Sequence, residues 1–169
     1  INSLCDAKII AALYEASAAG VKIELIIRGI CSLKVGIAGI SDNITVHSIV
    51  GNYLEHSRIF YFYNDGNEDI YMGSADWMPR NLDKRVEILF PVDDVEIKER
   101  IKHILDIQLR DNVKTRIKLA DSSYKQLTPE GDEPINSQDY FCREAIEQTR
   151  HAKKEKNSPR VFAPMKNPL

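Results

Sequence analysis

The chain has 169 residues, of which 43% are hydrophobic and 28% charged, and this suits one globular domain with a sizeable core. The formal net charge is −2, so the chain lacks the general basic surface that binds nucleic acids or membranes nonspecifically. We therefore expect no nucleic-acid partner, and any anion site must be built from local residues.

Three cysteines, Cys5, Cys31 and Cys142, are odd in number and far apart, which argues against a disulfide scaffold or a structural zinc site. No run approaches the roughly 20 apolar residues that cross a bilayer, so we expect no membrane span. These features favour a cytoplasmic protein, with any membrane association arising through a larger parent assembly. The sequence opens with Ile1 rather than Met, and we interpret it as a fragment of a longer protein.

The first predicted element is a helix over residues 2–19. Asn2 or Ser3 can cap its free N–H groups, and Asp6 suits the positive end of the helix dipole. Gly20 can end the helix, because glycine readily adopts the left-handed conformation found after a last turn.

A strand is predicted next. Residues 21–29, "VKIELIIRG", change from alternating to continuous apolar character, which is typical of a strand buried on both faces. The strand would end at Arg28, at the edge of a sheet where ligands commonly bind. Residues 30–43 carry two glycines and no strong period, which indicates a loop, and residues 44–51 are ambiguous between a strand and a short helical turn.

A β-hairpin is predicted after that. Residues 57–64, "SRIFYFYN", and residues 69–76, "DIYMGSAD", are rich in β-forming residues, and the turn residues 65–68 lie between them. Residues 85–92 predict a further strand, and residues 93–117 predict a long amphipathic helix with an acidic start. Helices that alternate with strands place the fold in the α/β class.

The composition changes after residue 120. We therefore expect a folded domain over residues 1–120 and a C-terminal extension over residues 121–169. The extension is predicted to contain a helix at about residues 137–156. Its end, from residue 157 onward, holds three of the seven prolines and is predicted to be mobile.

His56 comes just before the predicted hairpin, and Arg58 follows two residues later. In an extended run, positions i and i+2 share a face, so the two side chains are expected to point the same way. An imidazole can shuttle a proton or accept a phosphoryl group, and a guanidinium offers fixed donors to a phosphate. A lone histidine at a strand edge is more often structural, so a catalytic role requires partners nearby.

Candidate partners follow His56 in the sequence. The turn "GSAD" (73–76) has small residues that let a ligand approach the backbone, and Ser74 adds a hydroxyl group. Arg85 and Glu87 are expected on one strand face, where the ordinary interpretation is a surface ion pair worth at most ~1 kcal/mol. Support for a phosphate site is expected from four residues: Arg58, Ser74, Asp76 and Arg80.

The triplet H-x-R, the turn G-S-A-D and the motif R-x-E resemble one half of the phospholipase D superfamily signature. That signature is H-x-K followed by a G-S/T-x-N turn, and it occurs twice in one active site. Five blocks are similar, in order, to the last domain of the long-chain polyphosphate kinases of bacteria: "RGICSL", "GISDNI", "SIVGNYLEHSRIFYF", "SADWMPRNLDKRVE" and "FPV". This resemblance covers residues 1–120 and implies a phospholipase-D-like domain with a mixed β-sheet flanked by helices.

The resemblance implies an enzyme that moves the terminal phosphate of ATP onto polyphosphate, reversibly, through a phosphohistidine and with Mg²⁺. The phosphorylated histidine and the Mg²⁺ ligands are implied to lie in upstream domains. We therefore expect no metal site in this fragment and no turnover by the fragment alone. The expected partners are ATP or ADP, polyphosphate and the upstream domains, in a parent enzyme that forms homo-oligomers.

The resemblance also assigns roles to residues of this chain. His56 matches the histidine of the second phospholipase-D-like domain, which contacts nucleotide phosphate and suits a general acid. Arg28 matches the family's arginine that contacts ATP. Arg85 and Glu87 match positions that line the nucleotide end of a tunnel between the two domains.

Two departures from the superfamily signature are informative. Arg58 stands where the superfamily has Lys, and Asp76 stands where it has Asn. The same changes are general in this second polyphosphate-kinase domain, so they favour a half-site that holds charge. A carboxylate near phosphates would repel them unless it faces Arg80 or Mg²⁺, and the sequence does not decide between these two.

Two alternatives stay open at this stage. A phospholipase-D-like nuclease or phosphatidyl-transfer half-domain would share the fold, but it needs the Lys and Asn that are replaced here. A non-catalytic phosphate-binding module would keep the fold without the chemistry. Mutation of His56 in the parent enzyme would separate the module, which should lose little activity, from a catalytic half-site.

Overall fold

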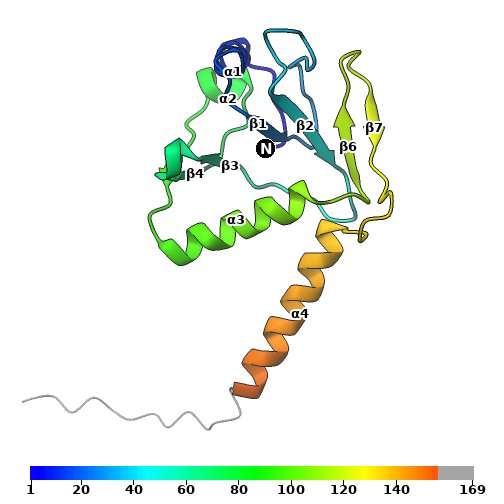
Figure 1. Ribbon diagram of the computed structural model, residues 1–169. Coiled ribbons are helices and arrows are strands. Elements are labelled where there is room, and N and C mark those ends of the chain that lie inside the picture. The colour runs from blue at the N-terminus through cyan, green and yellow to red at the C-terminus, as the bar shows by residue number, and fades with distance from the viewer. Residues whose placement is uncertain (156–169) are drawn as a thin grey trace, which may run out of the picture. The chain divides into compact units, whose positions relative to one another are not determined.

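The computed structural model describes the backbone of residues 1–155 (Figure 1). It contains two compact units, Ile1–Ser137 and the part from Gln138 onward. The proline-containing tail predicted from residue 157 lies outside the described residues. Among the described helices, none combines the length and the apolar character needed to cross a membrane.

The unit Ile1–Ser137 contains a mixed four-stranded sheet. Its strands, in spatial order, are β1 (Ile23–Ile26), β2 (Ile44–Ile49), β6 (Thr115–Lys118) and β7 (Tyr124–Gln126). β1 runs parallel to β2, whereas β2 with β6 and β6 with β7 are antiparallel. The ambiguous segment over residues 44–51 is therefore a strand, and the α/β class with a mixed sheet is confirmed.

A second, antiparallel sheet contains the predicted hairpin. Its strands are β3 (Ile59–Phe62), β4 (Asp69–Gly73) and β5 (Leu89–Pro91), with β4 in the centre. The 3₁₀ turn η1 (Asn64–Gly66) connects β3 to β4. All three of its residues have positive φ, which Asn, Asp and Gly tolerate better than other residues, so the turn chemistry explains the hairpin.

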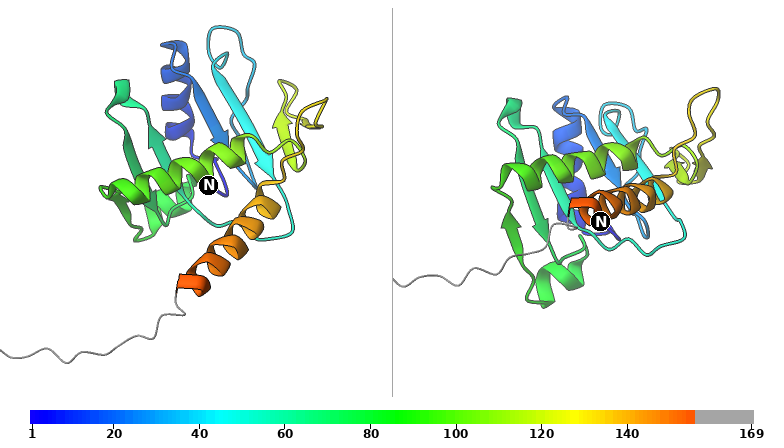
Figure 2. Two further views of the ribbon diagram at one scale, coloured as in Figure 1. Left: turned by 60° about the horizontal axis from the view of Figure 1, so that its bottom comes forward. Right: turned by 90° about the horizontal axis from the view of Figure 1, so that it is seen from below.

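The helices of the described residues are α1 (Ala7–Ala18), α2 (Pro79–Lys84), α3 (Val95–Leu109) and α4 (Ser137–Glu155), and α4 belongs from Gln138 onward to the second unit. Apolar residues of α1 pack on the core of the first sheet, in which Leu4, Ile27 and Val46 are fully buried. Ile101 of α3 packs against Ile70 of the second sheet. Figure 2 shows α3 running along one side of both sheets.

The predicted start of the first helix is wrong. Asp6 is the N-cap, and its carboxylate accepts hydrogen bonds from the backbone N–H groups of Lys8 and Ile9, each at 3.0 Å. Neither Asn2 nor Ser3 caps the helix, because the segment before Asp6 is extended and its backbone bonds to Ile30 and Trp77. The better cap therefore stands immediately before the first helical turn.

The extended segment Ile1–Cys5 connects the two sheets. Leu4 forms a β-bridge with Cys31, which follows β1, and another with Trp77, which follows β4. The Leu4 N–H donates to the Ile30 carbonyl at 2.8 Å, and the Trp77 N–H donates to the Ser3 carbonyl at 3.1 Å. The ends of β1 and β4 are thereby held on either side of this segment.

The predicted helix over residues 93–117 is wrong beyond Leu109. Asp111 is 1% exposed, and its carboxylate accepts hydrogen bonds from the N–H groups of Val113 at 3.0 Å and Lys114 at 2.7 Å. These bonds turn the chain out of the helix, and Thr115–Lys118 form β6 instead.

The strand predicted over residues 21–29 is shorter in the structure, where β1 is Ile23–Ile26. Glu24 within it is exposed, so the prediction that this strand is buried on both faces is wrong.

Candidate functional site

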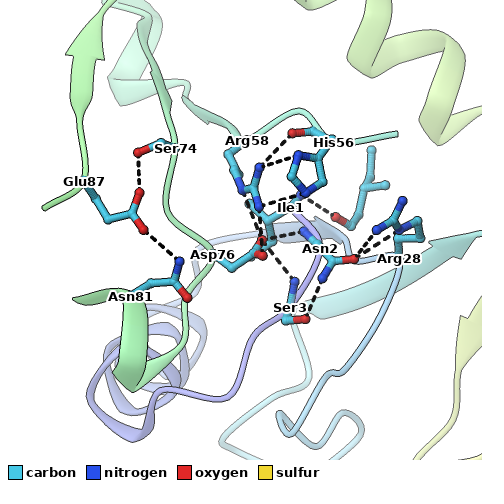
Figure 3. Close-up of polar contacts among 11 residues, drawn as sticks. Ile1, Asn2, Ser3, Arg28, His56, Arg58, Ser74, Asp76, Asn81 and Glu87 are labelled. Atoms are coloured by element: carbon cyan, nitrogen blue, oxygen red, sulfur yellow. Dashed lines mark hydrogen bonds and ion pairs between the residues drawn. The ribbon is translucent and has the colours of Figure 1, made fainter. Parts of the chain in front are cut away.

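Asp76, in the segment that follows β4, is the central acceptor of the site (Figure 3). It is 5% exposed and accepts the backbone N–H groups of Asn2 at 2.8 Å and Ser3 at 3.3 Å. Arg58 donates Nε to one carboxylate oxygen at 3.3 Å and Nη2 to the other at 3.0 Å. Asp76 thus faces Arg58, a partner that the sequence interpretation did not consider.

The contacts of Asp76 also set its charge state. Burial alone would raise the pKa of Asp76, but the hydrogen bonds from Arg58 and from the backbone of Asn2 outweigh burial and hold the pKa below its usual value. Asp76 is therefore an anion near neutral pH, neutralised by a guanidinium that is itself only 10% exposed.

Arg58 also reaches His56, which is exposed. Its Nη1 lies 3.1 Å from His56 Nδ1 and donates to the His56 carbonyl oxygen at 3.0 Å, and its Nη2 lies 3.3 Å from Nε2. A guanidinium only donates, and a neutral imidazole has one lone-pair nitrogen, so only one of these ring nitrogens can accept from Arg58. The two side chains meet as predicted, although both residues precede β3.

Arg28 joins the same network from the end of β1. Its Nε and Nη2 donate to the Asn2 side-chain oxygen at 3.1 and 2.6 Å. Because the Asn2 backbone donates to Asp76, one continuous chain of contacts runs from Arg28 to His56. We call this chain the Arg28–His56 network; its members are Arg28, Asn2, Asp76, Arg58 and His56.

Glu87 belongs to a second cluster. Ser74 donates its hydroxyl to one Glu87 carboxylate oxygen, and Asn81 of α2 donates its amide to the other at 2.9 Å. These bonds, from Ser74 first and from Asn81 second, lower the pKa of Glu87. The Ser74 hydroxyl also accepts the Ile88 N–H at 3.0 Å, so it holds the segment that leads into β5.

Arg80 and Arg85 belong to neither group. Both are exposed, and within the described part of the chain neither side chain makes a hydrogen bond or an ion pair, although the charge of Arg85 helps to lower the pKa of Glu87. Arg85 caps the C-terminal end of α2, and only Leu89–Pro91 form β5. The predicted strand over residues 85–92 is therefore wrong at its start, and Arg85 and Glu87 share no strand face.

The carboxylates of the site are engaged by donors from the protein. Asp76 accepts from Arg58, and Glu87 accepts from Ser74 and Asn81. Within the described residues, no group of three His, Cys, Asp or Glu side chains is placed to hold a metal ion. With both carboxylates engaged by protein donors, the chemistry of these residues is that of anion binding and hydrogen bonding.

Sequence reasoning missed the two asparagines of the site. The sequence pattern predicts a helix-capping role for Asn2 and no role for Asn81. The available signal was Asp6, which stands just before the helical pattern and is the stronger cap, so Asn2 is free for another role. No sequence pattern points to Asn81, because its contact with Glu87 depends on how α2 packs.

The fold and the Arg28–His56 network place this chain in the class of phospholipase-D-like α/β domains, with its cationic and ionisable groups close to strand ends. The chain belongs to the family described as polyphosphate kinase C-terminal domain 2, which matches residues 1–138. The resemblance read from the sequence is thereby confirmed.

Relatives of known name agree with this family. The chain is 54% identical over 149 residues to a polyphosphate kinase of Bacillus anthracis, covering 88% of this chain and 21% of that protein. It is 53% identical over 172 residues to a polyphosphate kinase of Lactiplantibacillus plantarum, covering 99% of this chain and 24% of that protein. The crystal structure of polyphosphate kinase from Porphyromonas gingivalis matches with a TM-score of 0.84 and 40% identity, over 89% of this chain and 23% of that chain. The chain thus spans less than a quarter of the length of these relatives.

Proposed function

We propose that this chain acts as the C-terminal domain of a polyphosphate kinase that reversibly transfers the terminal phosphate of ATP to polyphosphate. In this proposal the domain supplies the second histidine half-site and the contacts to ATP phosphates. The observation that carries it is the Arg28–His56 network, which gathers two guanidinium groups and an imidazole around one buried carboxylate in a member of this family.

Arg28 and His56 are the proposed phosphate-contacting residues. Arg28 supplies a positive charge at the end of β1, and His56 is exposed beside the Arg58 guanidinium. The imidazole nitrogen that accepts from Arg58 is a lone-pair nitrogen, so the other ring nitrogen carries the N–H. Both ring nitrogens lie against Arg58, so we propose that the exposed ring turns this N–H away from the guanidinium to donate to a phosphate oxygen, and that its proton then passes to a leaving phosphate group as charge develops there.

Arg58 and Asp76 have a positioning role in this proposal. The buried Asp76 anion cancels one charge and fixes the plane of the guanidinium, which then orients the imidazole. The arrangement supports a site that binds phosphate without supplying the nucleophile. Phosphorylation of a histidine is assigned to upstream domains, and we expect this chain alone to show no turnover.

The remaining candidate residues are given supporting roles. Glu87, held by Ser74 and Asn81, and the exposed Arg80 and Arg85 are proposed to line the nucleotide end of the site. Mg²⁺, which we expect the reaction to require, would be held outside this chain. A cytoplasmic homo-oligomer, and a division into a catalytic domain with a C-terminal extension, belong to the same proposal.

The test is mutation of His56 in a full-length polyphosphate kinase that carries this chain. His56→Ala is expected to lower kcat for polyphosphate synthesis by ~10²–10⁴-fold, the range typical of a lost general acid. His103→Ala, on α3 and outside the network, is the matched control and should keep nearly full activity. If His56→Ala retains wild-type kcat, the domain is a phosphate-binding module rather than a catalytic half-site.

A further inference from the structure

Asn2 connects Arg28 to Asp76 within the Arg28–His56 network (Figure 3). Its side-chain oxygen accepts both Nε and Nη2 of Arg28, and its side-chain amide donates to the Ser3 hydroxyl at 3.0 Å. Its backbone N–H donates separately to Asp76. The side chain of Asn2 therefore accepts hydrogen bonds from Arg28, whereas its backbone N–H donates to Asp76.

The charge of Arg28 is not cancelled by a carboxylate. Among the described residues, the guanidinium donates to the neutral amide of Asn2, and Arg28 enters no ion pair. Glu24 and Glu55 line the same cavity of about 130 Å³ as Arg28; Glu24 pairs with Lys22, and Glu55 accepts a hydrogen bond from Gln108. Nη1 of Arg28 is buried and has no hydrogen-bond partner, so a donor is left over at this site.

A neutral acceptor is chemically distinct from a charged one at this position. An asparagine oxygen fixes the guanidinium through two hydrogen bonds and leaves its full positive charge available to an anion. An aspartate at the same place would offer an oxygen of the same geometry. Its negative charge would neutralise Arg28 and repel a phosphate group.

We propose that Asn2 is a positioning residue that holds Arg28 without neutralising it, so that the guanidinium can bind a nucleotide phosphate. This inference rests on the proposed function of Arg28. It predicts that charge, more than the hydrogen-bond geometry alone, decides the effect of a substitution at Asn2. It also predicts that ATP binding changes and the chemical step does not, because the backbone contact to Asp76 survives any side-chain change.

The experiment compares Asn2→Asp, Asn2→Ala and Arg28→Ala in a full-length polyphosphate kinase carrying this chain, with kcat and the KM for ATP measured separately. Asn2→Asp is expected to raise the KM about tenfold, equivalent to ~1.4 kcal/mol of binding. Asn2→Ala is expected to raise it less, about threefold, because the charge of Arg28 remains. In both variants kcat should stay near the wild-type value.

The pH dependence separates charge from structure. As the pH falls towards the pKa of the introduced carboxyl, that group becomes neutral and resembles asparagine, so the KM defect of Asn2→Asp should shrink. A merely structural defect would not recover. Asn112→Asp is the matched control, since Asn112 also uses both ends of its amide, with the Glu133 carbonyl at 3.0 Å and the Ile135 N–H at 2.8 Å.

The outcomes are distinguishable. If Arg28→Ala raises the KM but Asn2→Asp and Asn2→Ala leave it at the wild-type value, the inference about Asn2 is wrong and the proposed role of Arg28 stands. If Arg28→Ala leaves the KM unchanged, the proposed role of Arg28 itself fails. Should Asn2→Asp not fold, as judged by thermal unfolding, Asn2→Ala decides: a lowered kcat with an unchanged KM overturns the inference.

Discussion

At the level of single residues, the pairing of Arg58 with Asp76 accounts for both departures from the superfamily signature. Each departs from the superfamily signature, and the sequence displays both departures but not their relation. In the structure they form one ion pair, 10% and 7% exposed at the side chains, so the two exchanges compensate. The proximity of His56 and Arg58 was predictable because they are two residues apart. The contact of Arg58 with Asp76 spans eighteen residues and depends on tertiary structure.

Asp76→Asn tests this pair through stability. The change leaves the Arg58 guanidinium buried without a counter-charge, so we expect a loss of about 3 kcal/mol in the free energy of unfolding at pH 7. The pKa of Asp76 is lower in the folded chain than in the unfolded one, so its stabilisation is present above pH ~4. It is lost as the pH falls through the folded value, and the difference from wild type should therefore narrow in acid.

Urea unfolding of both proteins over a range of pH measures this difference. Asp106→Asn is the matched control, because Asp106 pairs with Arg110 on the exposed surface of α3 and its loss should cost less than about 0.5 kcal/mol. A difference between wild type and Asp76→Asn that does not vary with pH would contradict the assignment of a charged Asp76.

At the level of elements, the sequence predicts those helix and strand boundaries that are set by neighbouring residues, such as turn residues and helix caps. The hairpin follows from its turn residues, and α3 begins near the predicted residue because Asp94 caps it. The ends of other elements depend on distant partners. Asp111 turns the chain out of α3 and is itself held by Ser137, and the segment before α1 is drawn into an extended form by Ile30 and Trp77. No periodicity reports such contacts, so these boundaries were missed.

Gly29→Ala tests how the segment before α1 is held. A Cβ at Gly29 would lie 2.9 Å from the Asn2 carbonyl oxygen and 3.3 Å from its side-chain oxygen, closer than such contacts normally occur. The segment must shift, which we expect to cost about 1–3 kcal/mol of stability and to raise the KM for ATP by displacing Asn2 from Arg28. Urea unfolding and steady-state kinetics of the full-length enzyme measure the two effects.

Gly39→Ala provides the comparison. Gly39 has a φ of +74° and no atom within 4 Å of the added Cβ, so the substitution strains the backbone by about 1–2 kcal/mol without touching the site. The two variants should therefore differ in their KM for ATP. Equal KM values would show that the position of Asn2 does not depend on the fit against Gly29.

For the whole molecule, the end of the folded domain is a feature on which composition and structure differ. Composition places the boundary at residue 120, whereas the compact unit runs to Ser137. Between these points β7 pairs with β6, and Ser137 donates both its N–H and its hydroxyl to Asp111 at 2.8 Å. Asp111 is 1% exposed and makes the turn between α3 and β6, so the chain after residue 120 closes the first sheet.

Truncation decides between the two boundaries. A chain ending after residue 138 keeps β7 and the Asp111–Ser137 hydrogen bonds, and we expect cooperative urea unfolding at nearly the midpoint of the whole chain. A chain ending after residue 120 exposes the edge of β6 and leaves the buried Asp111 carboxylate without Ser137, so we expect it to lose about 3 kcal/mol or to remain unfolded. Equal midpoints for the two truncated chains would place the boundary at residue 120, because the contacts made by residues 121–137 would then contribute nothing to the folded unit.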